Sequence, residues 1–210
     1  IAESGYRYAK IKTRGCRSES AVDLLRGIRK TLGPFCQVRV DFNASWSPDS
    51  VAEVICGALL PEQGLAPVMY LEDPLPPGGQ ADSALWPVPL ALDTRAFLNQ
   101  LIAPAICSRV QWGVWKPFVS WPVRFQMLQQ GWSVTVSSAC ESGVGTAALA
   151  ALALYGNIAP GAGLGSYQWL REDVLARRLP VADRPWADLR DLLVVSQSVV
   201  TDRLSLVQSG

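Results

Sequence analysis

Lysines and carboxylates recur in the first 120 residues at intervals long enough to hold one strand and one helix. They are Lys10, Lys12, Asp41, Glu72, Asp93 and Lys116. Intervals of about 20 to 30 residues fit a strand, a helix and two short connections, so these residues should stand at one level of successive βα units. Three carboxylates at the ends of parallel strands would make an oxygen-only site for a divalent metal ion, and the lysines would supply acid–base chemistry.

The composition excludes several other kinds of site. The 210 residues include no histidine, which excludes Ser-His-Asp and Cys-His catalysis and histidine-ligated zinc. Five widely spaced cysteines without a Cys-x-x-Cys pair fit reduced thiols in the cytoplasm. A net charge of +1 produces no strong electrostatic field that would attract nucleic acid or an anionic membrane. The longest apolar run, 147–155, is too short to span a membrane. We therefore expect a cytoplasmic protein whose partner is a small molecule. The sequence does not decide between a monomer and a homo-oligomer.

The elements that must position the charged residues alternate along the chain. Apolar residues that recur at every second position predict strands, and apolar residues that recur about every 3.6 positions predict helices. The predicted strands cover 6–12, 37–41, 68–72, 88–93, 110–116 and 132–137; the predicted helices cover 21–32, a segment opened by Ser47 and Pro48, 95–102, 122–130, 141–155 and 186–193. This alternation predicts a parallel α/β fold of about seven βα units.

Alternation within each predicted strand sharpens the pattern of charges. Lys10 and Lys12 lie two residues apart and share a face, because successive strand side chains point to opposite faces. Charges that face inward from a buried strand are costly unless they are paired or bind a metal ion. Asp73 directly follows Glu72, so we expect its side chain to face the other way and to bind no metal ion.

Six short motifs carry a family resemblance. They are KIK at 10–12, RVDFN at 39–43, LEDP at 71–74, ALD at 91–93, WKP at 115–117 and SSACESG at 137–143. In order and spacing they resemble the barrel of the enolase superfamily. The last motif and the glycine-rich segment 161–165 look like the o-succinylbenzoate synthase branch of that superfamily. The resemblance extends over residues 8–167.

The resemblance implies a fold, a cofactor and a reaction. The fold is a TIM-type (β/α) barrel, and the cofactor is Mg²⁺, with Mn²⁺ as the alternative, held by Asp41, Glu72 and Asp93. The enzyme is a lyase that dehydrates 2-succinyl-6-hydroxy-2,4-cyclohexadiene-1-carboxylate to 2-succinylbenzoate in menaquinone biosynthesis. Lys12 would remove the proton alpha to the carboxylate, and Lys116 would face the substrate from the other side. Enzymes of this superfamily generally pair a Lys or His base with Mg²⁺.

Other residues are candidates to contact the substrate: Lys10, Arg39, Asn43, Ser137, Ser138 and Gly163. The short serines and the backbone N–H groups near Gly163 suit a carboxylate such as the succinyl tail. Two of the candidates have other interpretations. Arg39 could support Asp41 or pair with another carboxylate, and the Asn43 amide could serve a local turn.

The chain also departs from the family pattern. Family members carry an N-terminal capping domain, and a first barrel strand and helix precede the K-x-K strand. We therefore expect 1–210 to be an incomplete C-terminal barrel domain, with 184–210 forming a C-terminal helix and tail. Two alternatives to the dehydratase stay open: an N-acylamino acid racemase or dipeptide epimerase, which also uses two facing lysines, and a non-catalytic barrel fragment.

Overall fold

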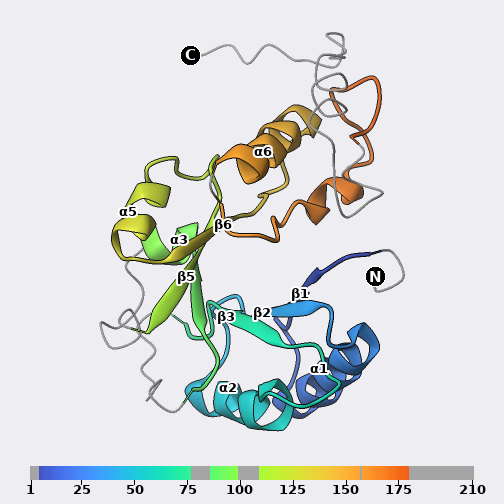
Figure 1. Cartoon of the computed structure of the whole chain (residues 1–210), viewed down its shortest axis with the longest axis vertical. Coiled ribbons are helices and arrows are strands. Elements are labelled where there is room, and N and C mark those ends of the chain that lie inside the picture. Colours follow the sequence, from blue (N-terminus) through green and yellow to red (C-terminus); the bar gives the residue numbers. More distant parts are fainter. Residues whose placement is uncertain (1–4, 77–85, 99–108, 157, 180–210) are drawn as a thin grey trace. The chain divides into compact units, whose positions relative to one another are not determined.

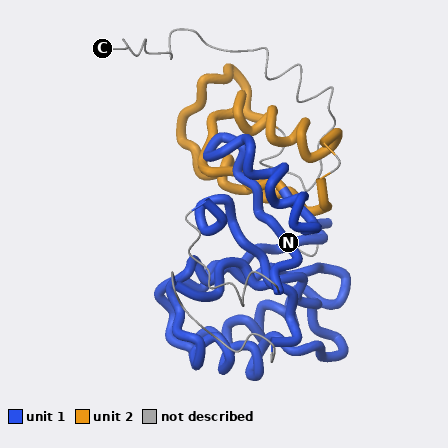
Figure 2. Tube along the Cα trace, turned by 90° about the vertical axis from the view of Figure 1, so that its left-hand side faces the viewer, with its two compact units in different colours: residues 1–135 blue, residues 136–210 orange. Residues whose placement is uncertain are grey.

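The computed structural model describes residues 5–76, 86–98, 109–156 and 158–179. The chain divides into two compact units, Ile1–Thr135 (unit 1) and Val136–Gly210 (unit 2), which Figure 2 colours separately. The predicted helix at 186–193 and the tail at 184–210 lie outside the described residues. The end of the predicted helix at 95–102 lies outside them as well.

Strands and helices alternate along unit 1, as the sequence predicts (Figure 1). The described strands form one sheet in chain order: β1 (Tyr8–Lys12), β2 (Gln37–Asp41), β3 (Val68–Glu72), β4 (Leu90–Asp93), β5 (Val110–Trp115) and β6 (Ser133–Val136). The described α-helices of unit 1 are α1 (Ser18–Leu32), α2 (Pro48–Val54), α3 (Thr94–Leu98) and α5 (Val123–Gln129). Each pairing from β1 to β5 is parallel, which is the arrangement that strand-helix-strand connections produce.

Local chemistry explains where several helices begin. Ser47 caps α2: its side-chain oxygen accepts a hydrogen bond from the Ser50 backbone N–H at 3.2 Å, and Pro48 occupies the first turn. Helix α2 continues into a π-helical segment, η1 (Ile55–Leu59), that no sequence pattern indicated. In unit 2, α6 (Gly143–Tyr155) is capped by Ser142, so the helix begins two residues later than predicted.

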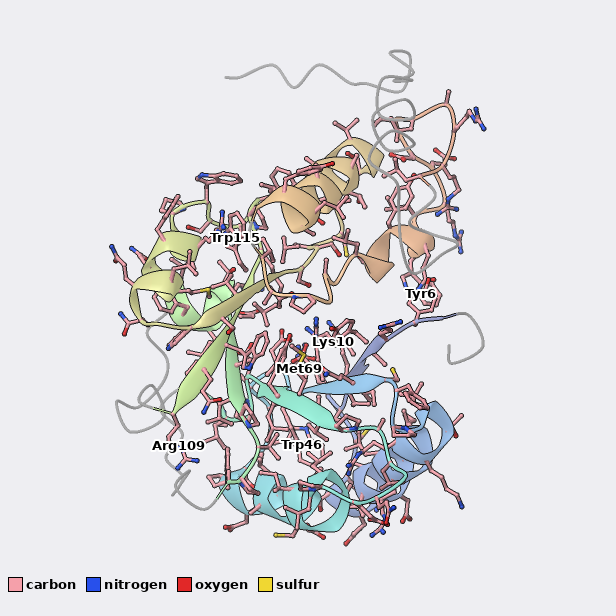
Figure 3. All side chains as sticks on the ribbon, viewed as in Figure 1. Tyr6, Lys10, Trp46, Met69, Arg109 and Trp115 are labelled. Atoms are coloured by element: carbon pink, nitrogen blue, oxygen red, sulfur yellow. The ribbon has the colours of Figure 1, made fainter. Side chains whose placement is uncertain are left out.

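The core of the first βα units lies between β2 and the helices that cover it. Val38, Val40 and Phe42 are fully buried and alternate along the chain with the charged residues of the opposite face. Helices α1 and α2 lie along the same face of β1–β3 (Figure 1). Trp46, labelled in Figure 3, packs edge-to-face on Phe42 with ring centroids 5.3 Å apart. The opposite face of the sheet therefore carries the polar residues.

Two one-residue bulges adjust the register of the sheet. Val38 pairs with Val68 but Arg39 pairs with Tyr70, so Met69 is an extra residue in β3. Similarly, Leu90 pairs with Val110 and Ala91 with Trp112, so Gln111 is an extra residue in β5. Beyond the first bulge, Asp41 stands opposite Glu72, and Lys12 stands opposite Asp41 across β1 and β2.

Strands β1 to β5 form a curled parallel sheet, and the described residues make up part of a (β/α) barrel, which confirms the expected fold class. Within the described residues, no helix is long and apolar enough to cross a membrane.

Candidate metal and acid-base site

The carboxyl ends of the parallel strands bring charged side chains from separate motifs together. The Lys10 ammonium lies 3.0 Å from Asp41 Oδ2 and 2.7 Å from Glu72 Oε2, and it donates a hydrogen bond to Glu72 Oε1 at 2.7 Å. Figure 3 labels Lys10, whose side chain reaches the ends of β2 and β3. Both carboxylates are almost completely buried. The sequence therefore predicted correctly that these strand ends meet.

Burial and neighbouring charge act in opposite directions on this group. Burial would lower the pKa of Lys10, but the Glu72 and Asp41 carboxylates outweigh it and raise that pKa above its usual value. The pKa of Glu72 is raised by burial, with Lys10 acting against the shift and Asp41 adding to it. Glu72 Oε2 is buried and accepts no hydrogen bond within the described part of the chain, although the Lys10 ammonium lies beside it.

Lys12 and Lys116 lie on either side of the carboxylates in the order of the sheet. The Lys12 ammonium is 4.0 Å from Asp41 Oδ2, and its side chain is 67% exposed, so it is open to an incoming molecule. The Lys116 ammonium donates to Asp93 Oδ2 at 2.6 Å, and its backbone N–H donates to Thr94 Oγ1 at 2.7 Å. No sequence signal indicated this supporting role of Thr94.

Asp93 is held by several groups at once. Its Oδ1 accepts the Ala96 backbone N–H at 2.9 Å, and Lys116 binds the other oxygen. Burial alone would raise the pKa of Asp93, but Lys116 and the backbone N–H groups lower it below its usual value. The role of Asp93 as a metal ligand stays a prediction.

Asp73 differs from the expectation. Carboxylate oxygens of Asp41, Glu72 and Asp73 lie within 4.8 Å of one another, so the Asp73 side chain joins the group instead of facing away. The physical reason is a backbone φ of +44° at Asp73, which ends the strand alternation directly after Glu72. Burial and the nearby Asp93 and Glu72 carboxylates raise the pKa of Asp73 well above its usual value. The signal available in the sequence was the Asp-Pro step, because Asp tolerates left-handed backbone and Pro ends a strand.

Arg39 and Asn43 occupy supporting positions. The Arg39 guanidinium is buried between two aromatic rings and lies 5.3 Å from the ring centroids of Tyr8 and Tyr70. The Asn43 backbone N–H donates to Asp41 Oδ1 at 2.9 Å, so the backbone of Asn43 takes part in a local turn. Contacts of either side chain with a substrate stay predictions.

In unit 2, an isolated parallel bridge joins Ser137 to Gly163. The Ser138 hydroxyl donates to the Gly163 carbonyl at 3.1 Å and also contacts the Ser166 hydroxyl. No sequence pattern indicated that Ser166 belongs to this group. The Gly163 N–H donates to the Val136 carbonyl at 2.9 Å, so it is not the bare anion-binding group that we expected. Ser137, Ser138 and Gly163 do lie together, and their contact with a substrate stays a prediction.

The comparisons with known proteins show the family and the fold of this chain. The family model described as "Enolase C-terminal domain-like" matches residues 1–109, which is half of the chain. This chain belongs to that family. A comparison with curated proteins found no significant match.

Solved structures resemble this enolase C-terminal domain-like chain at low sequence identity. Muconate lactonizing enzyme from Pseudomonas putida is 19% identical with a TM-score of 0.62, and the match covers 82% of this chain and 50% of that one. A dipeptide epimerase from Enterococcus faecalis, complexed with Mg and the dipeptide L-Leu-L-Tyr, is 18% identical with a TM-score of 0.66, and the match covers 87% and 53%. At these identities the likeness shows the fold. The chain spans about half the length of these structures.

The donor set fits a hard divalent cation. Carboxylate oxygens are the ligands that Mg²⁺ prefers, and those of Asp41, Glu72 and Asp73 converge within 4.8 Å, a group that does not include the predicted ligand Asp93. The Lys10 ammonium already lies between two of these side chains, which shows that their environment accepts positive charge. Glu72 Oε2 accepts no hydrogen bond among the described residues, but it lies 2.7 Å from the Lys10 ammonium.

Proposed function

We propose that this chain is the barrel portion of a Mg²⁺-dependent enzyme that removes the proton from the carbon next to a carboxylate. The observation that carries the proposal is the placement of Lys12 and Lys116 beside buried carboxylates at one end of a parallel sheet. Active sites of (β/α) barrels occupy that end. Asp41, Glu72 and Asp93 would hold the metal ion. When bound, Mg²⁺ (or Mn²⁺ in its place) supplies a Lewis acid that stabilises negative charge on the substrate carboxylate.

The specific reaction that we propose is the dehydration of 2-succinyl-6-hydroxy-2,4-cyclohexadiene-1-carboxylate to 2-succinylbenzoate, a step of menaquinone biosynthesis. Lys12 removes the ring proton alpha to the carboxylate, and the ring hydroxyl then leaves with a proton as water. Lys12 can reach a substrate because its side chain is 67% exposed, and it would act as a base in its neutral amine form. The assignment rests on the resemblance of the 137–143 segment and the glycine-rich 161–165 segment to one branch of the family.

The residues around the base have separate roles in this proposal. Lys10 compensates the charge of Asp41 and Glu72, and Lys116 faces the substrate from the side opposite Lys12. Arg39 and Asn43 would support the Asp41 side of the site. Ser137, Ser138 and Gly163 stay our candidates to bind the succinyl tail. We place the reaction in the cytoplasm, since Cys16, Cys36, Cys56 and Cys140 are free thiols.

Epimerisation of a dipeptide is the second candidate. It is supported by the structural likeness to the Enterococcus faecalis dipeptide epimerase and by the presence of two lysines on separate strands. Dehydration needs one base, because the proton is lost only once. Epimerisation needs both lysines, because one removes the proton and the other returns it to the opposite face.

The test measures both reactions of the purified chain with Mg²⁺. Dehydration is followed by 2-succinylbenzoate formation, and epimerisation by exchange of deuterium from D2O into a dipeptide. We expect Lys12→Ala to abolish dehydration and Lys116→Ala to retain a substantial part of it. Loss of the reaction in Lys12→Ala alone would support the dehydratase, and dipeptide exchange that needs both lysines would support the epimerase.

Metal binding is tested separately by calorimetry. We expect Glu72→Gln to lower Mg²⁺ affinity by at least about tenfold, because it removes a charged ligand from a buried site. Unchanged affinity in Glu72→Gln would refute the metal site. A chain that binds Mg²⁺ but catalyses neither reaction would support the non-catalytic barrel fragment.

A further inference from the structure

Asp73 joins the three strand ends that carry the carboxylates. Its backbone carbonyl accepts the Ala44 N–H at 2.8 Å, which ties it to the turn after β2. Its backbone N–H donates to the Ala91 carbonyl at 3.1 Å, in β4. Its side-chain Oδ1 accepts the Asp93 backbone N–H at 3.0 Å, in a buried position. Asp73 therefore contacts β4 through both its main chain and its side chain.

The side-chain contact is needed because the main-chain ladder between β3 and β4 is short. The register pairs only Leu71 with Leu90 and Glu72 with Ala91. Asp93 lies two residues beyond the last pair, so this ladder does not hold its backbone against β3. The Asp73 carboxyl group supplies the next hydrogen bond in that direction. It sets the distance between the backbones of Glu72 and Asp93.

The backbone at Asp73 is adapted to this contact. Its φ of +44° lies in the left-handed region, which costs energy for a residue that has a Cβ. Such a conformation persists where surrounding contacts hold it, and it turns the carboxyl group towards β4 and the carboxylate cluster. Asn43 and Ala44, on the turn that Asp73 also contacts, have positive φ values as well. The strain is thus concentrated at the ends of β2 and β3.

We propose that Asp73 is a positioning residue of the metal centre, which fixes Asp93 relative to Glu72 by accepting the Asp93 N–H. This inference rests on the proposed function, because it assigns Asp73 a role towards the ligands named there. The role depends on an oxygen acceptor in the left-handed conformation and not on the negative charge of Asp73.

Two substitutions separate the acceptor from the backbone conformation. Asp73→Asn keeps a side-chain oxygen at the same place and tolerates positive φ. Asp73→Gly tolerates positive φ but removes the acceptor. The comparison between them therefore isolates the hydrogen bond to Asp93. Mg²⁺ affinity is measured by calorimetry, and the fraction of folded protein in each sample is checked by urea unfolding.

We expect Asp73→Asn to bind Mg²⁺ within about threefold of the unsubstituted chain and Asp73→Gly to bind at least about tenfold more weakly, the scale on which contacts behind metal ligands act. Equal Mg²⁺ affinity of folded Asp73→Gly and the unsubstituted chain would overturn the inference, leaving Asp73 a purely structural role. Affinity lost equally in Asp73→Asn and Asp73→Gly would also overturn it, since the charge would then be what matters.

Glu72→Gln serves as the reference for the metal centre itself. If Glu72→Gln lowers the affinity while Asp73→Gly does not, the inference fails and the proposed metal site stands. If Glu72→Gln binds Mg²⁺ as the unsubstituted chain does, the proposed site fails and the inference is overturned with it.

Discussion

Two places where unit 1 buries charge differ in what surrounds that charge. The Arg29 side chain of α1 is 1% exposed and donates to backbone carbonyls: Nε to Ala66 at 2.7 Å, Nη2 to Leu60 at 3.1 Å and Nη1 to Ala58. Burial lowers the pKa of Arg29, but its donors are met by neutral acceptors around the end of η1. In this first place, one charge is surrounded by groups that satisfy it.

At the strand ends, several like charges crowd together instead. Burial and the neighbouring Asp41 carboxylate raise the pKa of Glu72, and Glu72 Oε2 accepts no hydrogen bond from the described residues. A buried charge with satisfied partners contributes to folding, whereas crowded carboxylates with acceptor capacity left over are suited to bind a cation. The comparison predicts that a substitution at Arg29 changes the free energy of unfolding, whereas substitutions at the strand ends also change the response to Mg²⁺.

Replacing Arg29 should have the largest effect on stability. Arg29→Met leaves the carbonyls of Ala58, Leu60 and Ala66 without donors, which should lower the free energy of unfolding by about 3 kcal/mol. Urea unfolding measures this loss. The Mg²⁺ affinity of the folded variant should be unchanged. A loss of Mg²⁺ affinity as large as that of Glu72→Gln would show that the two places are not independent.

Replacing Lys10 should have a smaller effect that depends on Mg²⁺. Lys10→Met removes the cation between Asp41 and Glu72, so unfolding without Mg²⁺ should become easier by about 2 kcal/mol. Because a metal ion would then supply the missing positive charge, added Mg²⁺ should raise the melting temperature more in Lys10→Met than in the unsubstituted chain. Thermal unfolding with and without Mg²⁺ measures the difference. Equal Mg²⁺-induced shifts would contradict the interpretation of these carboxylates as a cation site.

The pair of Lys116 and Asp93 should show a pH-dependent effect. The folded-state pKa of Asp93 lies below its unfolded value, so the pair stabilises the fold above about pH 4 and loses this contribution as the pH falls through the folded pKa. Lys116→Met should therefore lower the free energy of unfolding by about 1 to 2 kcal/mol at pH 7. Urea unfolding at several pH values should show this difference constant from pH 7 to 5 and shrinking towards pH 3. A difference that does not shrink would exclude Asp93 as its source.

Arg26 provides the matched control for Arg29 and should have the smallest effect. It lies one turn earlier in α1, donates to the Gly57 carbonyl at 3.2 Å and pairs with Glu62 at 3.0 Å, but both side chains are about half exposed. Arg26→Gln should change the free energy of unfolding by less than about 1 kcal/mol, because water screens and replaces these contacts. A loss as large as that of Arg29→Met would show that burial does not explain the importance of Arg29.

The sequence predicted the strands that carry the site because their apolar alternation and the turns between them are local signals. Strand β2 begins and ends where the pattern predicted, at Gln37 and Asp41, and Ser47 caps α2 as expected. The meeting of Asp41 and Glu72 followed from the rule that parallel strands end at one edge of a sheet.

Other features depend on tertiary structure and were not predictable from local patterns. Asp73 reverses its expected direction through one backbone angle, and the Gly163 N–H is taken by a carbonyl of another strand. Lys10 was a candidate to contact the substrate, which stays a prediction; its ion pairs with Asp41 and Glu72 were not indicated by the sequence. Spacing along the chain does not specify such contacts.

Met69 shows how an alignment of charges can depend on a residue that bears no charge. If the pairing of Val38 with Val68 continued one residue at a time, Asp41 would stand opposite Leu71. The bulge at Met69 instead places Glu72 opposite Asp41. Substituting the Met69 side chain should matter little to that alignment as long as the bulge remains, whereas inserting a residue between Tyr70 and Glu72 should move Glu72 away from Asp41. The register of a strand is therefore as much a part of the site as the identity of its carboxylates.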